Sequence, residues 1–244
     1  IGAVMCQLLG VSSNKKVDIQ FTIREFHHRG KGNPHGWGFA FHQNGDWKII
    51  KEPASLSAKD IKDEQFKFRS KAIIGHVRFI SCGNQTHLNT HPFKINKWAF
   101  AHNGTVNGIM KDPQFALAAF KPEGKTDSEY AFCYLLEKIN NEPENIKEVL
   151  EREAQKIRQY GKFNFLLSDG NTLFAYGDDR LYYVQREAPF DTVTLIDDQY
   201  SVNLKEIKAP DEKAIIIATE PLTVNEKWKR INGLKVFKGG KEVK

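Results

Sequence analysis

The sequence predicts a single α+β domain, in which helices cover antiparallel sheets. Two observations support this fold class. Short apolar runs of strand length gather near both ends of the chain, and the two strongest helical patterns lie between them. The 244 residues also contain no internal repeat, no low-complexity segment and no Pro/Gly/Ser-rich hinge that would divide them. We therefore expect one domain over residues 6–244, preceded by an expression artefact or a short leader at residues 1–5.

Composition sets the broad class of the protein. Hydrophobic residues make up 40% of the chain and charged residues 27%, as is typical of soluble globular proteins. No apolar run approaches the length of a membrane span, so we expect no membrane partner. The formal charge of +6 is spread along the chain without a compact basic motif, so we expect no nucleic-acid partner. Three cysteines without a secretory signal favour a cytoplasmic location.

A helix and a hairpin are the clearest elements of the N-terminal part. Apolar residues recur at helical spacing over residues 17–28 and predict a helix there. Asn44-Gly45 lies between two apolar runs and is a strong signal for a two-residue hairpin turn. The other elements expected here are strands over residues 8–11, 37–41, 47–50, 72–79 and 98–102, a short helix over residues 58–66 and a glycine-rich loop over residues 30–36.

The middle of the chain carries the two main helical patterns. Thr126 and Glu129 have the spacing of a capping box, which predicts a helix from there to about Ile139. A second helix is expected over residues 143–160, where Gly161 would end it. Strands are then expected over residues 163–168, 172–176, 181–184, 214–218 and 234–237.

Cys6 is the first residue with a clear chemical interpretation, because it directly follows Met5. If Met5 is the initiator, its removal would leave Cys6 with a free α-amine beside its thiol. Such an amine has a pKa of about 7.7–8.0 and can act as a base near neutral pH. A nucleophile activated by its own N-terminal amine is an established route to covalent catalysis. The alternative is a small hydrophobic residue at the start of a buried strand.

Four further residues could bind or activate a substrate. Arg78 ends an apolar strand, where a guanidinium could clamp a carboxylate or simply form a surface salt bridge. The Asn103 side chain and the Gly104 N–H could form an oxyanion hole, or the two residues could be an ordinary turn. Asp127 starts the capped helix and could bind an ammonium group or merely favour the helix dipole.

Short motifs in a fixed order along the chain carry a family resemblance. After Met5-Cys6 they are His-Gly-Trp-Gly at 35–38, Gly-His-Val-Arg at 75–78, Asn-Thr-His-Pro at 89–92, His-Asn-Gly at 102–104 and Thr-Asp-Ser-Glu at 126–129. With these motifs the chain resembles the class II glutamine amidotransferases, most closely their stand-alone, single-domain YafJ-type members. Residues 164–170 and 218–222 resemble later motifs of the family. Phe79 stands where many relatives have Trp or Tyr, and Thr219 replaces a usual Ser.

The resemblance implies an N-terminal-nucleophile hydrolase fold, a four-layer αββα sandwich with two stacked antiparallel sheets between helical layers. It also implies that residues 6–244 form a single amidotransferase domain. The roles that it implies are nucleophile for Cys6 with its α-amine as the base, oxyanion hole for Asn103 and Gly104, carboxylate binding for Arg78, ammonium binding for Asp127, and shaping of the pocket for His91.

The implied function is hydrolysis of the γ-carboxamide of glutamine through a cysteinyl thioester, which releases glutamate and ammonia. A separate protein could accept the ammonia, and no cofactor is implied. Two alternatives stay open: hydrolysis of another γ-glutamyl compound, such as a γ-glutamyl peptide or thiol, and a non-enzymatic binding module with the same fold. All eight histidines lie between His27 and His102, but their spacing does not favour a metal site.

Overall fold

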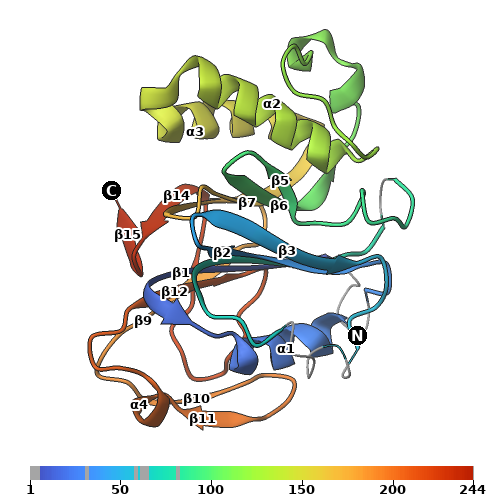
Figure 1. The fold of residues 1–244 in the computed structure, drawn as a ribbon. Helices are drawn as coiled ribbons and strands as arrows, with labels where there is room; N and C mark the ends of the chain where they lie inside the picture. Colours follow the sequence, from blue (N-terminus) through green and yellow to red (C-terminus); the bar gives the residue numbers. More distant parts are fainter. Residues whose placement is uncertain (1–5, 31–32, 58–59, 61–65, 81–82, 244) are drawn as a thin grey trace.

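The computed structural model has four layers, which Figure 1 shows in order from top to bottom. Helices α2 (Asp127–Asn141) and α3 (Ile146–Ile157) form one outer layer. Two antiparallel sheets form the middle layers, and helix α1 (Gln20–Gly30) covers the outer face of the sheet that contains β1. This arrangement confirms the predicted αββα sandwich. The structure describes residues 6–30, 33–57, 60, 66–80 and 83–243.

The first sheet is built around its first strand. β1 (Gln7–Val17) lies between β12 (Ala214–Ala218) and β4 (Ser70–Val77) and pairs antiparallel with both. The first half of β1 is continuously buried, because this central strand has a packed layer on each of its faces. The order of the seven strands is β13 (Lys229–Arg230), β9 (Tyr182–Arg186), β12, β1, β4, β2 (Trp37–Gln43) and β3 (Asp46–Glu52).

The second sheet stacks on the first. Alternate residues of a strand point to opposite faces, so Ala99 and Ala101 of β6 pack toward Leu8 and Ile217 of the first sheet. Phe100, between these two alanines, points the other way and belongs to the core beneath α2. The order of the six strands is β15 (Lys241–Val243), β14 (Gly233–Lys238), β8 (Thr172–Gly177), β7 (Gly161–Ser168), β6 (Trp98–Val106) and β5 (Phe93–Ile95).

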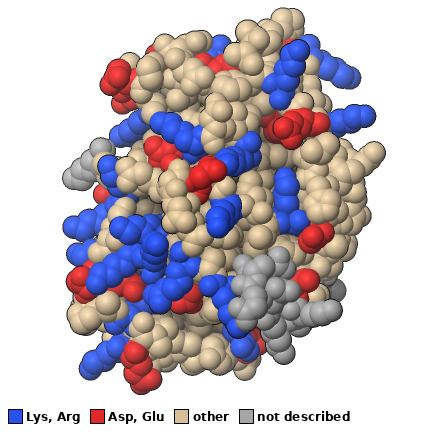
Figure 2. Space-filling view, in the orientation of Figure 1, with Lys and Arg blue, Asp and Glu red and all other residues tan. Residues whose placement is uncertain are grey.

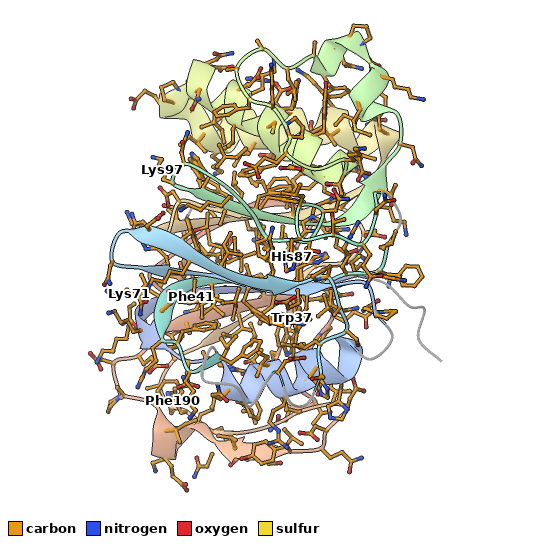
Figure 3. The ribbon with its side chains drawn as sticks, turned by 45° about the vertical axis from the view of Figure 1, so that its right-hand side comes forward. Trp37, Phe41, Lys71, His87, Lys97 and Phe190 are labelled. Atoms are coloured by element: carbon orange, nitrogen blue, oxygen red, sulfur yellow. The ribbon has the colours of Figure 1, made fainter. Side chains whose placement is uncertain are left out.

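Each helical layer covers the outer face of one sheet with apolar side chains. Phe132 of α2 stacks on Phe100 of β6, with ring centroids 5.0 Å apart. On the other side, Trp37 and Phe41 of β2 point toward α1 and share a core with Phe26 of that helix (Figure 3). Beyond α1 lie the short strands β10 (Thr192–Thr194) and β11 (Ser201–Asn203) and the short helix α4 (Leu204–Ile207) (Figure 1).

Two helices differ from their predicted bounds. The helix expected from residue 17 begins only at Gln20, because Val17 still pairs with Ser70 as the last residue of β1. The helix expected over residues 143–160 is shorter. α3 is flanked by single 3₁₀ turns, η5 (Pro143–Asn145) before it and η6 (Arg158–Tyr160) after it.

Half of the predicted capping box is present at α2. The Thr126 hydroxyl accepts the Glu129 N–H at 3.1 Å, which confirms Thr126 as the N-cap. The Glu129 carboxylate accepts the N–H groups of Glu123 and Gly124 at 3.0 and 2.7 Å. Glu129 therefore holds the loop that leads into the helix, and this loop positions Asp127 at the first helical residue.

The predicted hairpin is confirmed. Asn44 and Gly45 join β2 to β3 with φ angles of 55° and 83°, the left-handed values that a two-residue turn of this type requires. The strands that the sequence did not predict, β5, β10, β11, β13 and β15, have two or three residues each and show no periodicity of their own. The short helix predicted over residues 58–66 lies largely outside the described residues.

Charged side chains are mixed on the surface. On the face drawn in Figure 2, acidic residues lie among the lysines and arginines. Several basic residues form ion pairs, such as Arg24 with Asp198 at 2.7 Å and Lys94 with Asp46 at 2.8 Å. Within the part of the chain that the structure describes, no helix is both long enough and apolar enough to cross a membrane.

Candidate active site

Cys6 directly precedes β1, where the ends of the two neighbouring strands flank it. Pairing of β1 with β4 brings Phe79 next to the thiol: the Phe79 N–H donates to Cys6 Sγ at 3.1 Å, and the thiol lies 3.3 Å from the Phe79 carbonyl oxygen. On the other side, Thr219 follows β12, and its hydroxyl accepts the Leu8 N–H at 2.8 Å. Cys6 is partly exposed, whereas Cys133 is buried.

Burial raises the pKa of the Cys6 thiol above its ordinary value. The Phe79 backbone and the Arg78 guanidinium act in the opposite direction and offset only part of this effect. A thiol with a raised pKa is largely protonated at neutral pH, and the protonated form is a poor nucleophile. Catalysis at this sulfur therefore needs a base that removes the proton.

Asn103 reaches Cys6 from the second sheet. It lies inside β6, so the interpretation of Asn103-Gly104 as a turn is wrong. Because Ala99, Ala101 and Asn103 alternate along the strand, Asn103 faces the first sheet. Its side-chain amide nitrogen donates to the Cys6 carbonyl oxygen at 2.6 Å and to the Thr219 hydroxyl at 3.2 Å. A strong donor is thus fixed beside the thiol-bearing residue.

Gly104 occupies a position that accepts no side chain. Its φ is 145°, and a Cβ atom built on it would lie 1.9 Å from the Lys162 carbonyl oxygen of β7. The absence of a side chain lets β6 and β7 approach each other closely at this point. It also leaves backbone exposed next to Cys6, because Gly104 and Cys6 line the same recesses.

Arg78 and Asp127 line a small recess next to Cys6, with a volume of about 20 Å³. Arg78 is only 3% exposed, so the interpretation as a surface salt bridge is wrong. Its guanidinium donates to the Asn84 carbonyl oxygen at 3.2 Å. Asp127 is also buried and accepts the Val106 N–H at 2.7 Å. The recess therefore combines a cation and an acid, although Asp127 also sits where it favours the dipole of α2.

His91 lies between this recess and a second buried histidine. The ring centroids of His91 and His76 are 4.3 Å apart, and the described residues offer neither ring a hydrogen-bond partner. Burial lowers the pKa of His91 well below its ordinary value and that of His76 to about 3. Both rings are neutral at physiological pH, so His91 adds shape to the recess but no charge.

His102 is held in one tautomer by its two neighbours. Nε2 lies 3.1 Å from the Lys162 carbonyl oxygen, which can only accept, so Nε2 carries the proton. Nδ1 lies 2.8 Å from the Ser128 hydroxyl and accepts from it. With both nitrogens engaged, His102 braces the recess and is not a free base for Cys6. No group of three or more His, Cys, Asp or Glu residues within the described ranges could hold a metal ion.

Comparison with known proteins identifies the family. A family model described as class II glutamine amidotransferases matches residues 5–244. The chain belongs to this family. A protein of Methanocaldococcus jannaschii that is named as uncharacterized is 40% identical, across 98% of this chain and 71% of its own length. YafJ of Escherichia coli, named as a candidate glutamine amidotransferase, is 36% identical across 93% of this chain and 94% of its own length.

Solved structures of other glutamine amidotransferases share the fold. A crystal structure from Pseudomonas aeruginosa, described as a predicted glutamine amidotransferase, superposes with a TM-score of 0.73 at 29% identity and covers 98% of this chain and 100% of that chain. The glutamine phosphoribosylpyrophosphate amidotransferase of Bacillus subtilis gives a TM-score of 0.61 at 16% identity, across 96% of this chain and 49% of its own. The second likeness shows the N-terminal-nucleophile fold alone.

This class II glutamine amidotransferase also has a second recess, which the sequence did not predict. Its volume is about 210 Å³, and it shares Cys6, Phe79 and Gly104 with the smaller one. Asn164 lies in one of the later family motifs, so this position of the wall was marked in the sequence. No local pattern marked the charged residues of the wall, because separate strands and a loop bring them together. The residues that line only the larger recess are Asn103, Thr105, Lys162, Asn164, Asp179 and Arg180.

Proposed function

We propose that this protein hydrolyses the γ-carboxamide of glutamine through a thioester on Cys6 and releases glutamate and ammonia. One observation carries the proposal. A partly exposed thiol, a buried guanidinium and a buried carboxylate line one recess, and the amide donor Asn103 contacts the thiol-bearing residue, although these groups come from two strand ends, the inside of a third strand and a helix start. Glutamine carries a carboxylate and an ammonium at one end and a carboxamide at the other, so each of these groups has a partner on the substrate.

The first half of the reaction forms the thioester. The α-amine of Cys6, in a chain that begins at this residue, takes the thiol proton, and the sulfur bonds to the γ-carbon. Asn103 Nδ2 and the Gly104 N–H stabilise the oxyanion that develops on the carbonyl oxygen. Asn103 would redirect its 3.2 Å contact with Thr219 for this purpose and keep the shorter one with Cys6. The bond from the γ-carbon to nitrogen then breaks, and ammonia leaves with the proton.

The second half releases the product. The same amine removes a proton from water, which attacks the thioester carbon and displaces the Cys6 sulfur. Throughout, Arg78 holds the α-carboxylate through two parallel hydrogen bonds, Asp127 holds the α-ammonium, and the neutral His91 shapes the wall of the recess. The ammonia goes to solvent or to a separate accepting protein, and the reaction needs no cofactor. We place this activity in the cytoplasm, where a free nucleophilic thiol stays reduced.

The test is direct measurement of turnover and of the covalent intermediate. Protein with Cys6 as its first residue should release glutamate and ammonia from glutamine in equal amounts. Acid quenching during turnover should trap a protein whose mass is raised by one γ-glutamyl group. Cys6→Ala should abolish both signals, whereas Cys133→Ala should keep them because Cys133 is buried away from the recess. Absence of turnover in correctly folded protein would favour the non-enzymatic binding module.

A further inference from the structure

One buried side chain, that of Asn89, joins the two loops on which Arg78 and Asp127 depend. Asn89 lies in the Asn-Thr-His-Pro motif, from which the proposed reaction uses only His91. It is 4% exposed, and its carboxamide can donate hydrogen bonds at one end and accept them at the other. Burying such an amide costs free energy unless both of its ends are bonded, so the partners of Asn89 indicate its role.

The nitrogen end of this amide holds the carbonyl group to which Arg78 is anchored. Asn89 Nδ2 donates to the Asn84 carbonyl oxygen at 3.0 Å, and Arg78 Nη1 donates to the same oxygen at 3.2 Å. A carbonyl oxygen has two lone pairs and can accept both bonds. The loop turns at Gly83, which has a φ of 73°, and a Cβ atom there would lie 3.1 Å from Asn89 Nδ2. Loss of the Asn89 amide would therefore leave the Asn84 carbonyl, and with it the Arg78 guanidinium, less firmly held.

The oxygen end of the amide holds the segment that leads into α2. Asn89 Oδ1 accepts the Lys125 N–H at 2.8 Å, two residues before Asp127. A Cβ atom on Gly124 would lie 2.5 Å from the same oxygen, so a side chain there would press on the amide. Asp127 has a further anchor, because its carboxylate accepts the Val106 N–H at 2.7 Å. On this side the Asn89 amide is therefore one support among others.

The two charges that this amide serves belong to different layers of the sandwich. Arg78 directly follows β4 of one sheet, whereas Asp127 begins α2 in the outer layer that covers the other sheet (Figure 1). A substrate held at both its carboxylate and its ammonium group needs the two charges at a fixed separation, because a misplacement of about 1 Å can cost about 100-fold in rate. The loop that carries Asn89 lies between β4 and β5 and is bonded to both segments.

We propose that Asn89 is a positioning residue for the substrate, whose amide sets the separation between the Arg78 guanidinium and the Asp127 carboxylate. This inference rests on the proposed function and adds a residue that acts through the two groups that hold the substrate. Loss of the amide weakens recognition of the amino-acid head of glutamine, its α-carboxylate and α-ammonium groups, and leaves the reactivity of the thiol unchanged. The effect runs mainly through Arg78, since Asp127 keeps its bond to Val106.

Two alkylating reagents separate recognition of the head from reactivity of the thiol. A diazoketone analogue of glutamine, 6-diazo-5-oxo-L-norleucine, keeps the α-carboxylate and the α-ammonium, whereas iodoacetamide has neither. In protein that begins at Cys6, the mass of the Cys6 peptide gives a labelling rate for each reagent. Asn89→Ala should slow labelling by the diazoketone roughly 10–100-fold, the range expected for loss of one hydrogen bond to a charged group, and leave the iodoacetamide rate within about twofold.

A double-variant cycle tests whether Asn89 acts through Arg78. Arg78→Lys already lacks the planar fork, so adding Asn89→Ala to it should cost much less than Asn89→Ala costs alone. The matched control is Asn14→Ala, near the other end of β1. The Asn14 amide also bridges two backbone segments, because it donates to the Asp211 carbonyl oxygen and accepts the Lys213 N–H, both at 2.8 Å. This control should change neither labelling rate.

Glutamine turnover is measured first and by itself tests the proposed function, whereas the labelling rates test Asn89 without any turnover. If Asn89→Ala does not fold, Asn89→Asp takes its place. It has the same size and keeps the acceptor for the Lys125 N–H, but it cannot donate to the Asn84 carbonyl oxygen and should show the same selective loss. Equal slowing of both reagents, an unchanged diazoketone rate, or fully additive losses in the cycle would overturn the role of Asn89 and leave the proposed glutaminase in place.

Discussion

At the scale of single residues, Asn103 links the fold to the proposed chemistry. Its amide nitrogen contacts Cys6 and Thr219, and its carbonyl oxygen accepts from Asn164. Asn103→Ala should reduce kcat roughly 10²–10³-fold, the usual loss for one oxyanion donor. KM should change far less, because the interaction is completed only in the transition state. Steady-state kinetics with glutamine measure both quantities.

The control for Asn103→Ala is stability, because the same amide also holds the Cys6 backbone. The melting temperature of the variant shows whether the turnover loss comes from a damaged fold. Thr219→Val removes the hydroxyl that Asn103 contacts but leaves Asn103 in place, and it should cost much less activity. Normal turnover in folded Asn103→Ala would exclude the oxyanion role.

Arg78 allows a test of substrate recognition. Arg78→Lys keeps the positive charge but loses the planar fork that can hold a carboxylate with two bonds. We expect kcat/KM for glutamine to fall roughly 10–100-fold, mainly through KM. Asp127→Asn should act in the same direction, because it removes the negative partner of the ammonium group. If both variants kept the parent kcat/KM, the buried pair would not bind the glutamyl head.

At the scale of secondary-structure elements, local signals predicted the elements that do not depend on distant partners. The Asn44-Gly45 turn and the Thr126 cap are formed by neighbours in sequence, and both were predicted. Asn103-Gly104 shows the limit of such signals. These residues also carry a turn signal, but pairing with Asn164 and Phe163 of β7 keeps them in a strand. The three residues of the His-Asn-Gly motif do not show whether a partner strand is available.

The candidate site also has one part that short motifs predicted and one part that they did not. Most residues of the small recess lie in short motifs of the family, and the structure places Cys6, Arg78, His91 and Asp127 around it. The charged wall of the large recess comes from β7 and from the loop after β8, which hydrogen bonds of Asn164 hold in place. Such long-range contacts leave no periodic trace in the sequence, so this half of the site was visible only in three dimensions.

The start of β1 carries a prediction about the base. With residues 1–5 attached, the Cys6 nitrogen is an amide and cannot accept the thiol proton. Because burial already raises the pKa of the thiol, the attached form should hydrolyse glutamine slowly or not at all. A chain that begins at Cys6 should be active. Intact mass identifies the N-terminus of each form, and glutamate release gives its rate. Full activity with residues 1–5 attached would exclude the α-amine as the base.

At the scale of the whole molecule, stacking two sheets buries polar groups next to the site. His76 points between the sheets from β4, and His91 lies against it from the loop before β5. Both are almost fully enclosed, and the pKa of each is lowered by burial. The sandwich therefore needs both rings to be neutral. This requirement links the stability of the whole fold to pH.

The sign of that link follows from proton binding. Below about pH 6.5 the unfolded chain protonates its histidines, whereas native His76 stays neutral down to about pH 3. The unfolded state thus binds more protons, and the free energy of unfolding should fall as the pH falls. One such group contributes about 1.4 kcal/mol per pH unit, so about 3 kcal/mol is lost by pH 4. Urea unfolding at a series of pH values measures the slope.

A pair of variants separates this effect from the general acid sensitivity of carboxylates. His76→Gln should lower stability at neutral pH, because it places an amide between the sheets, but it should flatten the pH slope by about one proton between pH 6.5 and 4. The matched control is His87→Gln, since the His87 side chain is 59% exposed and should leave the slope unchanged. The change in slope is independent of the loss of stability at neutral pH. If His76→Gln kept the pH slope of the parent protein, the buried ring would not gain a proton on unfolding, and the proposed link between His76 and pH would be excluded.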